Sequence, residues 1–130
     1  MRTDLIKLRL TVALAGVLAT ATVAVYRVPV AEIPEAAQQP GALLFQAKGC
    51  SGCHTIAGVA ESASVGPNLT HLASVANERV VGLTATAYVI QSIREPGAFT
   101  VEGFGVGVMP TFDLTDVEVE KLVEFLLTDR

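Results

Sequence analysis

Two cysteines and a histidine within five positions constrain this chain more than any other feature. The sequence of 130 residues has only two cysteines, and both lie in the stretch Cys50-Ser51-Gly52-Cys53-His54. The C-x-x-C-H pattern is the attachment signal of a c-type haem. Two thiols at this spacing can form thioethers with the two vinyl groups of one porphyrin, and the adjacent imidazole then lies under the iron. We predict one covalently bound haem c, with His54 as an iron ligand.

Three other uses of the same residues are weaker. A dithiol redox motif would require a thioredoxin-like βαβ context, which the sequence lacks. A structural zinc site requires four ligands, and His71 is the one obvious donor outside the motif. An oxidising compartment could also join the two cysteines in a disulfide. The haem interpretation is favoured because it accounts for the histidine that directly follows Cys53.

The globular part is predicted to be a small all-α domain, because it shows no strand alternation and no internal repeat. Prolines and glycines delimit the expected segments. Helices are expected over residues 41–48, around 69–75 and over 84–94, and residues 97–113 are expected to form a loop.

The last helix, expected over residues 115–128, has the strongest pattern. Thr115 and Glu118 have the spacing of a capping box at its start. Apolar residues recur at i, i+3, i+4 and i+7 and predict one buried stripe on this helix. The stripe consists of Val119, Leu122, Val123 and Leu126.

The N-terminal segment is apolar and flanked by basic residues. Residues 10–26 carry no charge and would span roughly 26 Å as a helix, close to the thickness of a bilayer core. A cleaved signal peptide, cut near Ala19-Thr20-Ala21, would have a shorter apolar core. We expect an uncleaved single-pass anchor over residues 1–27, with residues 5–26 in lipid. The positive-inside rule places the N-terminus in the cytoplasm and residue 28 onward on the periplasmic or outer side.

Residues 28–40 contain three prolines, which disfavour both helix and sheet. We expect an extended tether here, leading to a haem domain over residues 41–130. A strap packed on a partner subunit is the alternative for the same segment.

Charge is distributed unevenly between the two parts of the chain. Residues 1–27 hold four basic and one acidic side chain, whereas residues 28–130 hold five basic and twelve acidic ones. The acidic domain argues against nucleic acid as a partner. It favours a partner protein that has a basic docking surface, or a partner that is already held beside this domain.

Two further motifs follow the cysteine pair, Gly66-Pro67-Asn68-Leu69 and Val108-Met109-Pro110. With them the sequence resembles class I cytochromes c, especially the single-haem domains attached to membrane-bound respiratory complexes. The resemblance covers about residues 41–127 and implies a small cytochrome c fold, with three main helices around one haem. The other residues that carry it are Gly41, Phe45, Tyr88, Ile93 and the stripe of the last helix.

The resemblance implies a role for each matching side chain. His54 is the proximal ligand, and the carbonyl of Pro67 accepts a hydrogen bond from its other ring nitrogen. Leu69 packs on the haem, and Met109 supplies sulfur to the sixth iron position. Arg79 pairs with a haem propionate, with a solvated arginine as the alternative.

A close crossing of the first and last helices is also implied. Gly41 and Phe45 are expected to meet the last helix near Leu122 and Leu126. A small residue at such a crossing lets the two backbones approach closely.

Met109 is the preferred sixth ligand, although a lone methionine is often core filler. It follows a glycine-rich loop and precedes Pro110, so it can approach a flat cofactor closely. His71 is the other candidate donor. It lies soon after Pro67, on the segment expected to flank the proximal side, and is expected to face solvent.

Histidine and methionine ligands together leave no open iron position, which predicts an electron carrier without enzyme activity or small-molecule substrate of its own. Three functions are candidates: an electron-transfer subunit of a membrane oxidoreductase complex, a free-standing anchored cytochrome that shuttles between complexes, and a five-coordinate haem enzyme or gas sensor. The first is favoured, with other redox subunits as partners. The resemblance suggests an alternative complex III type of host, an oxygen reductase or a nitric-oxide reductase. Phe104, Val106 and Val108 could form an apolar docking face, or pack on the haem instead.

Overall fold

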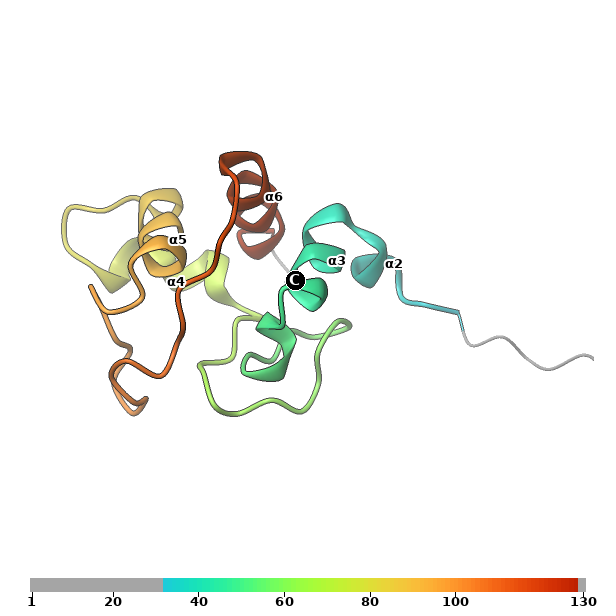
Figure 1. Ribbon diagram of the computed structural model, residues 1–130, viewed down its shortest axis with the longest axis horizontal. Helices are drawn as coiled ribbons and strands as arrows, with labels where there is room; N and C mark the ends of the chain where they lie inside the picture. The colour runs from blue at the N-terminus through green and yellow to red at the C-terminus, as the bar shows by residue number, and fades with distance from the viewer. Residues whose placement is uncertain (1–31, 129–130) are drawn as a thin grey trace, which may run out of the picture. The chain divides into compact units, whose positions relative to one another are not determined.

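The computed structural model describes residues 32–128, and the compact unit within them begins at Ile33. Figure 1 shows this unit as a set of short helices joined by loops. Among the described residues, the one β pairing is an isolated bridge between Ile56 and Ala60, so the all-α prediction is confirmed. The helices are α2 (Glu35–Gln38), α3 (Pro40–Ala47), the 3₁₀ helix η1 (Cys50–Gly52), α4 (Leu72–Arg79), α5 (Ala85–Arg94) and α6 (Asp116–Leu126).

The two longest helices begin at the residues that their sequences predict. The hydroxyl of Thr84 accepts a hydrogen bond from the amide of Ala87 and caps α5. At α6 the complete capping box forms between Thr115 and Glu118. The predicted stripe of α6 is buried, with each of its four side chains at most 8% exposed.

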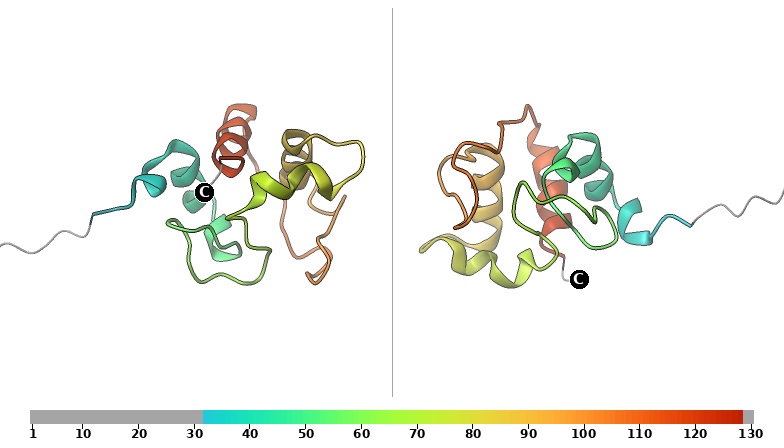
Figure 2. Two further views of the ribbon diagram at one scale, coloured as in Figure 1. Left: turned by 180° about the vertical axis from the view of Figure 1, so that it is seen from behind. Right: turned by 90° about the horizontal axis from the view of Figure 1, so that it is seen from below.

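Helix α6 lies between α3 and α5, as the views in Figures 1 and 2 agree. The largest fully buried side chains come from three separate parts of the chain: Phe45 on α3, Ile56 after the cysteine motif, and Leu122 and Phe125 on α6. The rings of Phe45 and Phe125 lie 5.9 Å apart between centroids, at 57° to each other. This aromatic pair joins the first and last helices of the core.

The crossing of α3 and α6 is closer than an alanine would allow. A Cβ atom on Gly41 would lie 2.3 Å from the carbonyl oxygen of Lys121 and 2.3 Å from Cβ of Phe125. The predicted close approach at Gly41 is therefore present. The atoms nearest to that Cβ belong to Lys121 and Phe125, which directly precede Leu122 and Leu126, and Phe45 lines a small cavity together with Leu122 and Leu126.

Helix α4 begins three residues later than predicted and extends to Arg79. The side chain of Asn68 accepts a hydrogen bond from the amide of Thr70 over 2.8 Å, which holds the chain in a local turn. The amide of Leu69 donates to the carbonyl of Thr55 over 2.8 Å, a contact with a distant segment. Residues 70 and 71 form a turn, in which the amide of Leu72 donates to the carbonyl of Leu69 over 3.1 Å, and the helix begins after it.

The prediction of a fully extended tether over residues 28–40 is wrong for residues 35–38, which form α2. Pro34 occupies the N-cap of this turn and Pro40 is the first residue of α3, so neither ring interrupts a helix. Ala37 is only 7% exposed, which shows that the turn packs on the domain. Burial of this small apolar residue accounts for the local order.

The predicted membrane anchor over residues 1–27 lies outside the described residues. Within the part of the chain that the structure covers, no helix has the length and apolar character needed to cross a bilayer.

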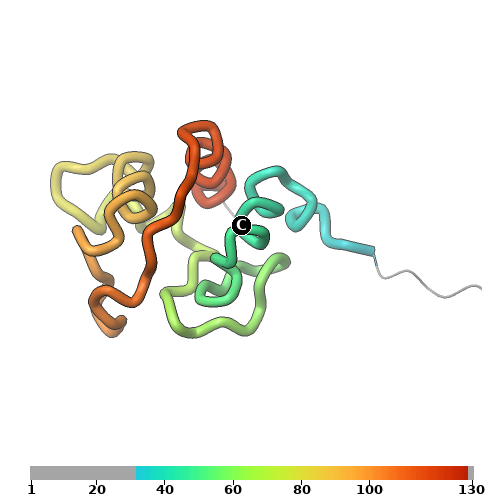
Figure 3. Tube along the Cα trace, in the orientation of Figure 1, coloured from blue at the N-terminus to red at the C-terminus, as the bar shows by residue number. Residues whose placement is uncertain are grey.

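The loop between α5 and α6 is the longest connection in the domain. Figure 3 shows it leaving α5, running away from the helices and returning to the start of α6.

An ion pair across the α3–α6 contact gives a pH-dependent prediction. Nζ of Lys48 lies 2.8 Å from Oε1 of Glu118, and this contact, followed by the capping bonds at Thr115, lowers the pKa of Glu118 to about 2. A carboxylate with a lowered pKa stabilises the fold above its ordinary value of 4.5, and this stabilisation is lost as the pH falls towards 2.

We therefore expect Glu118→Gln to lower the thermal midpoint at neutral pH and to converge with the unsubstituted protein at about pH 2–3. Thermal unfolding curves at several pH values provide the measurement. Glu120→Gln is the control, because it removes the same charge from an exposed position on the same helix. Equal effects of the two substitutions at every pH would contradict the role assigned to the Lys48–Glu118 pair.

Candidate functional site

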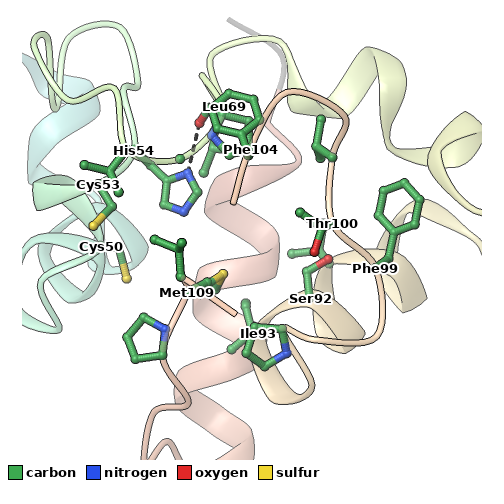
Figure 4. Close-up of a pocket in the computed structure, with 18 of the residues that line it drawn as sticks. Cys50, Cys53, His54, Leu69, Ser92, Ile93, Phe99, Thr100, Phe104 and Met109 are labelled. Atoms are coloured by element: carbon green, nitrogen blue, oxygen red, sulfur yellow. Dashed lines mark hydrogen bonds between the residues drawn. The ribbon is translucent and has the colours of Figure 1, made fainter. Parts of the chain in front are cut away.

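The cysteine motif begins just after α3 ends. Gly49 follows the helix with a φ of 81°, a left-handed conformation that favours glycine, and turns the chain into η1. The amide of His54 donates to the carbonyl of Cys50 over 3.0 Å, so the motif forms one tight turn. Figure 4 shows both cysteine sulfurs on the same side of a cavity. Both thiols are free, and burial raises the pKa of the Cys50 thiol.

The segment after the motif orients the ring of His54. Its Nδ1 lies 2.9 Å from the carbonyl oxygen of Pro67, the hydrogen bond that the resemblance implies. A carbonyl oxygen can only accept, so Nδ1 carries the proton and Nε2 keeps its lone pair. Figure 4 shows the ring turned into the cavity. His54 is therefore prepared to bind a metal ion through Nε2.

Gly66 packs against the face of the same ring, a contact that the sequence pattern did not reveal. A Cβ atom at this position would lie 2.4 Å from Cε1, 2.7 Å from Nδ1 and 2.9 Å from Nε2 of His54. The amide of Gly66 also donates to the carbonyl of Cys53 over 2.8 Å. The one sequence feature that indicates this contact is the glycine directly before Pro67, because glycine permits the closest approach of a backbone to a ring.

Met109 reaches the cavity from the loop between α5 and α6. Two glycines turn this loop at positive φ, Gly103 at 89° and Gly107 at 72°. The Met109 side chain is half-buried and lines the cavity. Figure 4 shows His54 and Met109 both turned into this space. The structure thus brings together two side chains that lie 55 positions apart in the sequence.

The cavity has a volume of about 240 Å³ and mostly apolar walls. The face of α5 that lines it carries Tyr88, Val89, Ser92 and Ile93, and Phe99 packs edge-on against Tyr88, with ring centroids 5.9 Å apart. Two aromatic walls, Phe99 and Phe112, were not predicted because they lie in a loop without periodicity. The α5 wall, in contrast, follows helical spacing and could have been read from the sequence.

The remaining predicted residues divide into two groups. Pro67 and Leu69 line the cavity, as expected of residues beside the cofactor. Arg79, the last residue of α4, does not line it. The Nε atom of Arg79 is buried, and it has no hydrogen-bond partner among residues 32–128. The propionate contact of Arg79 therefore stays a prediction. His71 is exposed and does not line the cavity, as predicted.

The donor set of the cavity fits a haem better than a bare metal ion. Two thiols share one side of the cavity, an imidazole with a free Nε2 points into it, and a thioether enters from the facing loop. Apolar walls suit a porphyrin, whose faces are apolar. No group of three or more histidine, cysteine or acidic side chains that could hold an ion occurs in the described range.

Comparison with known proteins agrees with this geometry. The family model described as Cytochrome c matches residues 38–129, which include the cysteine motif, the Gly66–Leu69 turn and Met109. A search of curated proteins finds no match. The chain belongs to the cytochrome c family, as a class I c-type cytochrome that carries a covalently attached haem and transfers electrons.

Proposed function

We propose that His54 and Met109 are the two axial ligands of the haem iron, and that the chain is an electron-transfer subunit of a membrane oxidoreductase complex. The observation that carries the ligand pair is the single cavity into which both side chains turn, with Nδ1 of His54 held by the carbonyl of Pro67. Such a pair leaves no iron position for a substrate. It also raises the reduction potential of the haem relative to that of a haem with stronger donor ligands.

The chain's own residues bind and orient the cofactor in this proposal. When bound, the haem supplies reversible one-electron chemistry at its iron. Cys50 and Cys53 fix the porphyrin by thioether bonds. The Pro67 carbonyl keeps the proton on Nδ1 of His54, which makes Nε2 the ligand and prevents rotation of the ring. Leu69 and the aromatic walls exclude water from the cavity, which favours retention of the Met109 sulfur on the iron.

The rim of the cavity supports docking of a second redox protein. Val65, Val106 and Val108 are 52%, 82% and 53% exposed, and Val65 and Val108 also line the cavity. Apolar side chains at this exposure, grouped at one opening, are typical of interaction surfaces. The chain as a whole has a formal net charge of −4. We expect a partner with an apolar centre and a basic surround, because opposite charge speeds encounter.

The membrane part of the proposal is supported by the sequence of residues 1–27. In this proposal residues 5–26 cross the cytoplasmic membrane, the N-terminus is cytoplasmic, and the haem domain lies on the periplasmic or outer side. Other redox subunits of the host complex are the partners, and an alternative complex III type of assembly is the preferred host. Tethering next to fixed partners would raise the effective concentration of the acidic haem domain.

Met109→Ala tests the ligand pair. We expect the oxidised holoprotein to show the long-wavelength thioether-to-iron absorption band and the reduced protein to exclude carbon monoxide. The substitution should remove the band, allow carbon monoxide binding and lower the reduction potential, because it opens the sixth position. Val106→Ala is the control and should keep all three properties, because Val106 is 82% exposed on the same loop and does not line the cavity. Carbon monoxide binding by the unsubstituted protein would instead favour a five-coordinate enzyme or sensor.

Gentle detergent extraction of the full chain from its native membranes tests the host. Stoichiometric recovery with other redox subunits is expected, and their identification would also give the direction of electron flow. Recovery of the full chain alone in the membrane fraction would favour an anchored shuttle between complexes. Recovery without detergent would contradict the anchor.

A further inference from the structure

Arg94, the last residue of α5, joins the two ends of the loop that carries Met109. Its Nη1 donates to the carbonyl of Leu114 over 2.5 Å, and its Nη2 lies 2.7 Å from Oδ1 of Asp116. These contacts span 20 and 22 positions of sequence. One guanidinium therefore closes residues 95–113 into a loop at its base.

Backbone hydrogen bonds within this loop are local. The amide of Ala98 donates to the carbonyl of Glu95 over 2.8 Å, and that of Phe104 donates to Val101 over 3.2 Å. Neither bond joins the start of the loop to its end. The Arg94 contacts provide that connection, and they fix the separation of the two loop segments that leave α5 and enter α6 (Figure 3).

The closure is also coupled to Met109 by packing. Leu114 is only 6% exposed, and with Met109 and Phe112 it lines a second, smaller cavity in the core. A shift of the Leu114 backbone would therefore change the packing around the methionine side chain. An interaction at the base of the loop thus acts on the position of its sulfur atom.

We propose that Arg94 is a positioning residue that keeps Met109 on the iron by closing its loop. The inference rests on the proposed ligation by Met109 and names the residue that stabilises it. Arginine suits this place for two reasons. Its planar guanidinium donates in two fixed directions, which a lysine ammonium does not reproduce. Its charge also lies at the C-terminus of α5, where the helix dipole favours a cation.

Arg94→Gln in the oxidised holoprotein provides the test. Thermal titrations would follow the thioether-to-iron band and far-ultraviolet circular dichroism in the same sample. We expect the band to disappear well below the unfolding temperature of the variant. At room temperature the fraction of protein that lacks the band should rise by at least about tenfold, because the loss of even one of the two charged contacts has an effect of that order. The reduction potential should fall as the sulfur leaves.

Lys48→Gln is the matched control. It removes the same charge from an ion pair of similar length, 2.8 Å, and similar side-chain exposure, 31% against 33% for Arg94. That pair joins α3 to α6 and does not close the methionine loop. We expect the band and the circular dichroism of this variant to be lost together. Arg94→Lys should give an intermediate separation of the two transitions.

Two outcomes would overturn the inference, and they differ. If Arg94→Gln shifts the band and the unfolding transition together, as Lys48→Gln does, Arg94 stabilises the fold without positioning Met109. If the unsubstituted protein lacks the band, Met109 is not a ligand, and the proposed ligand pair fails together with the inference.

Discussion

A single methyl group at position 66 is expected to prevent normal haem ligation. In Gly66→Ala the new Cβ would lie 2.4 Å from Cε1 of His54, far inside van der Waals contact. The ring cannot retreat without losing the 2.9 Å bond from its Nδ1 to Pro67. The backbone of residue 66 is itself held by a 2.8 Å bond to the carbonyl of Cys53. We therefore expect the imidazole to be displaced from the position in which it binds iron.

The yield and spectrum of the purified holoprotein would measure this effect. We expect Gly66→Ala to lower the yield severely and to leave the remaining haem with an open or exchanged proximal position, detected by carbon monoxide binding and a changed potential. Gly97→Ala is the control, because Gly97 is exposed and a Cβ there meets no atom within 4 Å. A Gly66→Ala protein with normal yield, spectrum and potential would contradict the contact between Gly66 and His54.

Gly41→Ala is expected to destabilise the domain, although alanine normally stabilises a helix by about 0.5–1 kcal/mol over glycine. The reversal follows from the crossing of α3 and α6, where the new Cβ would lie 2.3 Å from the Lys121 carbonyl oxygen and 2.3 Å from Cβ of Phe125. Backbone atoms cannot move aside as a flexible side chain can. Separating the helices would also disturb the Phe45–Phe125 pair, so we expect a loss of about 3 kcal/mol.

Thermal unfolding followed by circular dichroism would show this loss. At about 4–8 °C per kcal/mol for a domain of this size, the midpoint should fall by roughly 12–24 °C. Gly97→Ala again serves as the control and should shift the midpoint little. An unchanged or raised midpoint in Gly41→Ala would show that α3 and α6 are not in close contact at this glycine.

The parts of the fold that were predicted correctly are those formed by contacts between residues close together in the sequence. The capping box at Thr115 and Glu118 and the buried stripe of α6 require only contacts within one helix or a repeating face. The α5 helix likewise begins at its own threonine cap. The errors occur where a distant segment competes. Helix α4 starts after a turn whose Leu69 bonds to the distant Thr55, and in α2 Ala37 is buried against the domain.

The site divides in the same way. The sequence by itself determined the covalent haem, because the spacing of two thiols and a histidine is a property of five consecutive residues. Only the tertiary structure decided what surrounds that haem. It placed Gly66 against the His54 ring, turned Met109 into the same cavity and closed the methionine loop with Arg94. These contacts join segments far apart in sequence, and no local pattern encodes them because they depend on how the helices pack.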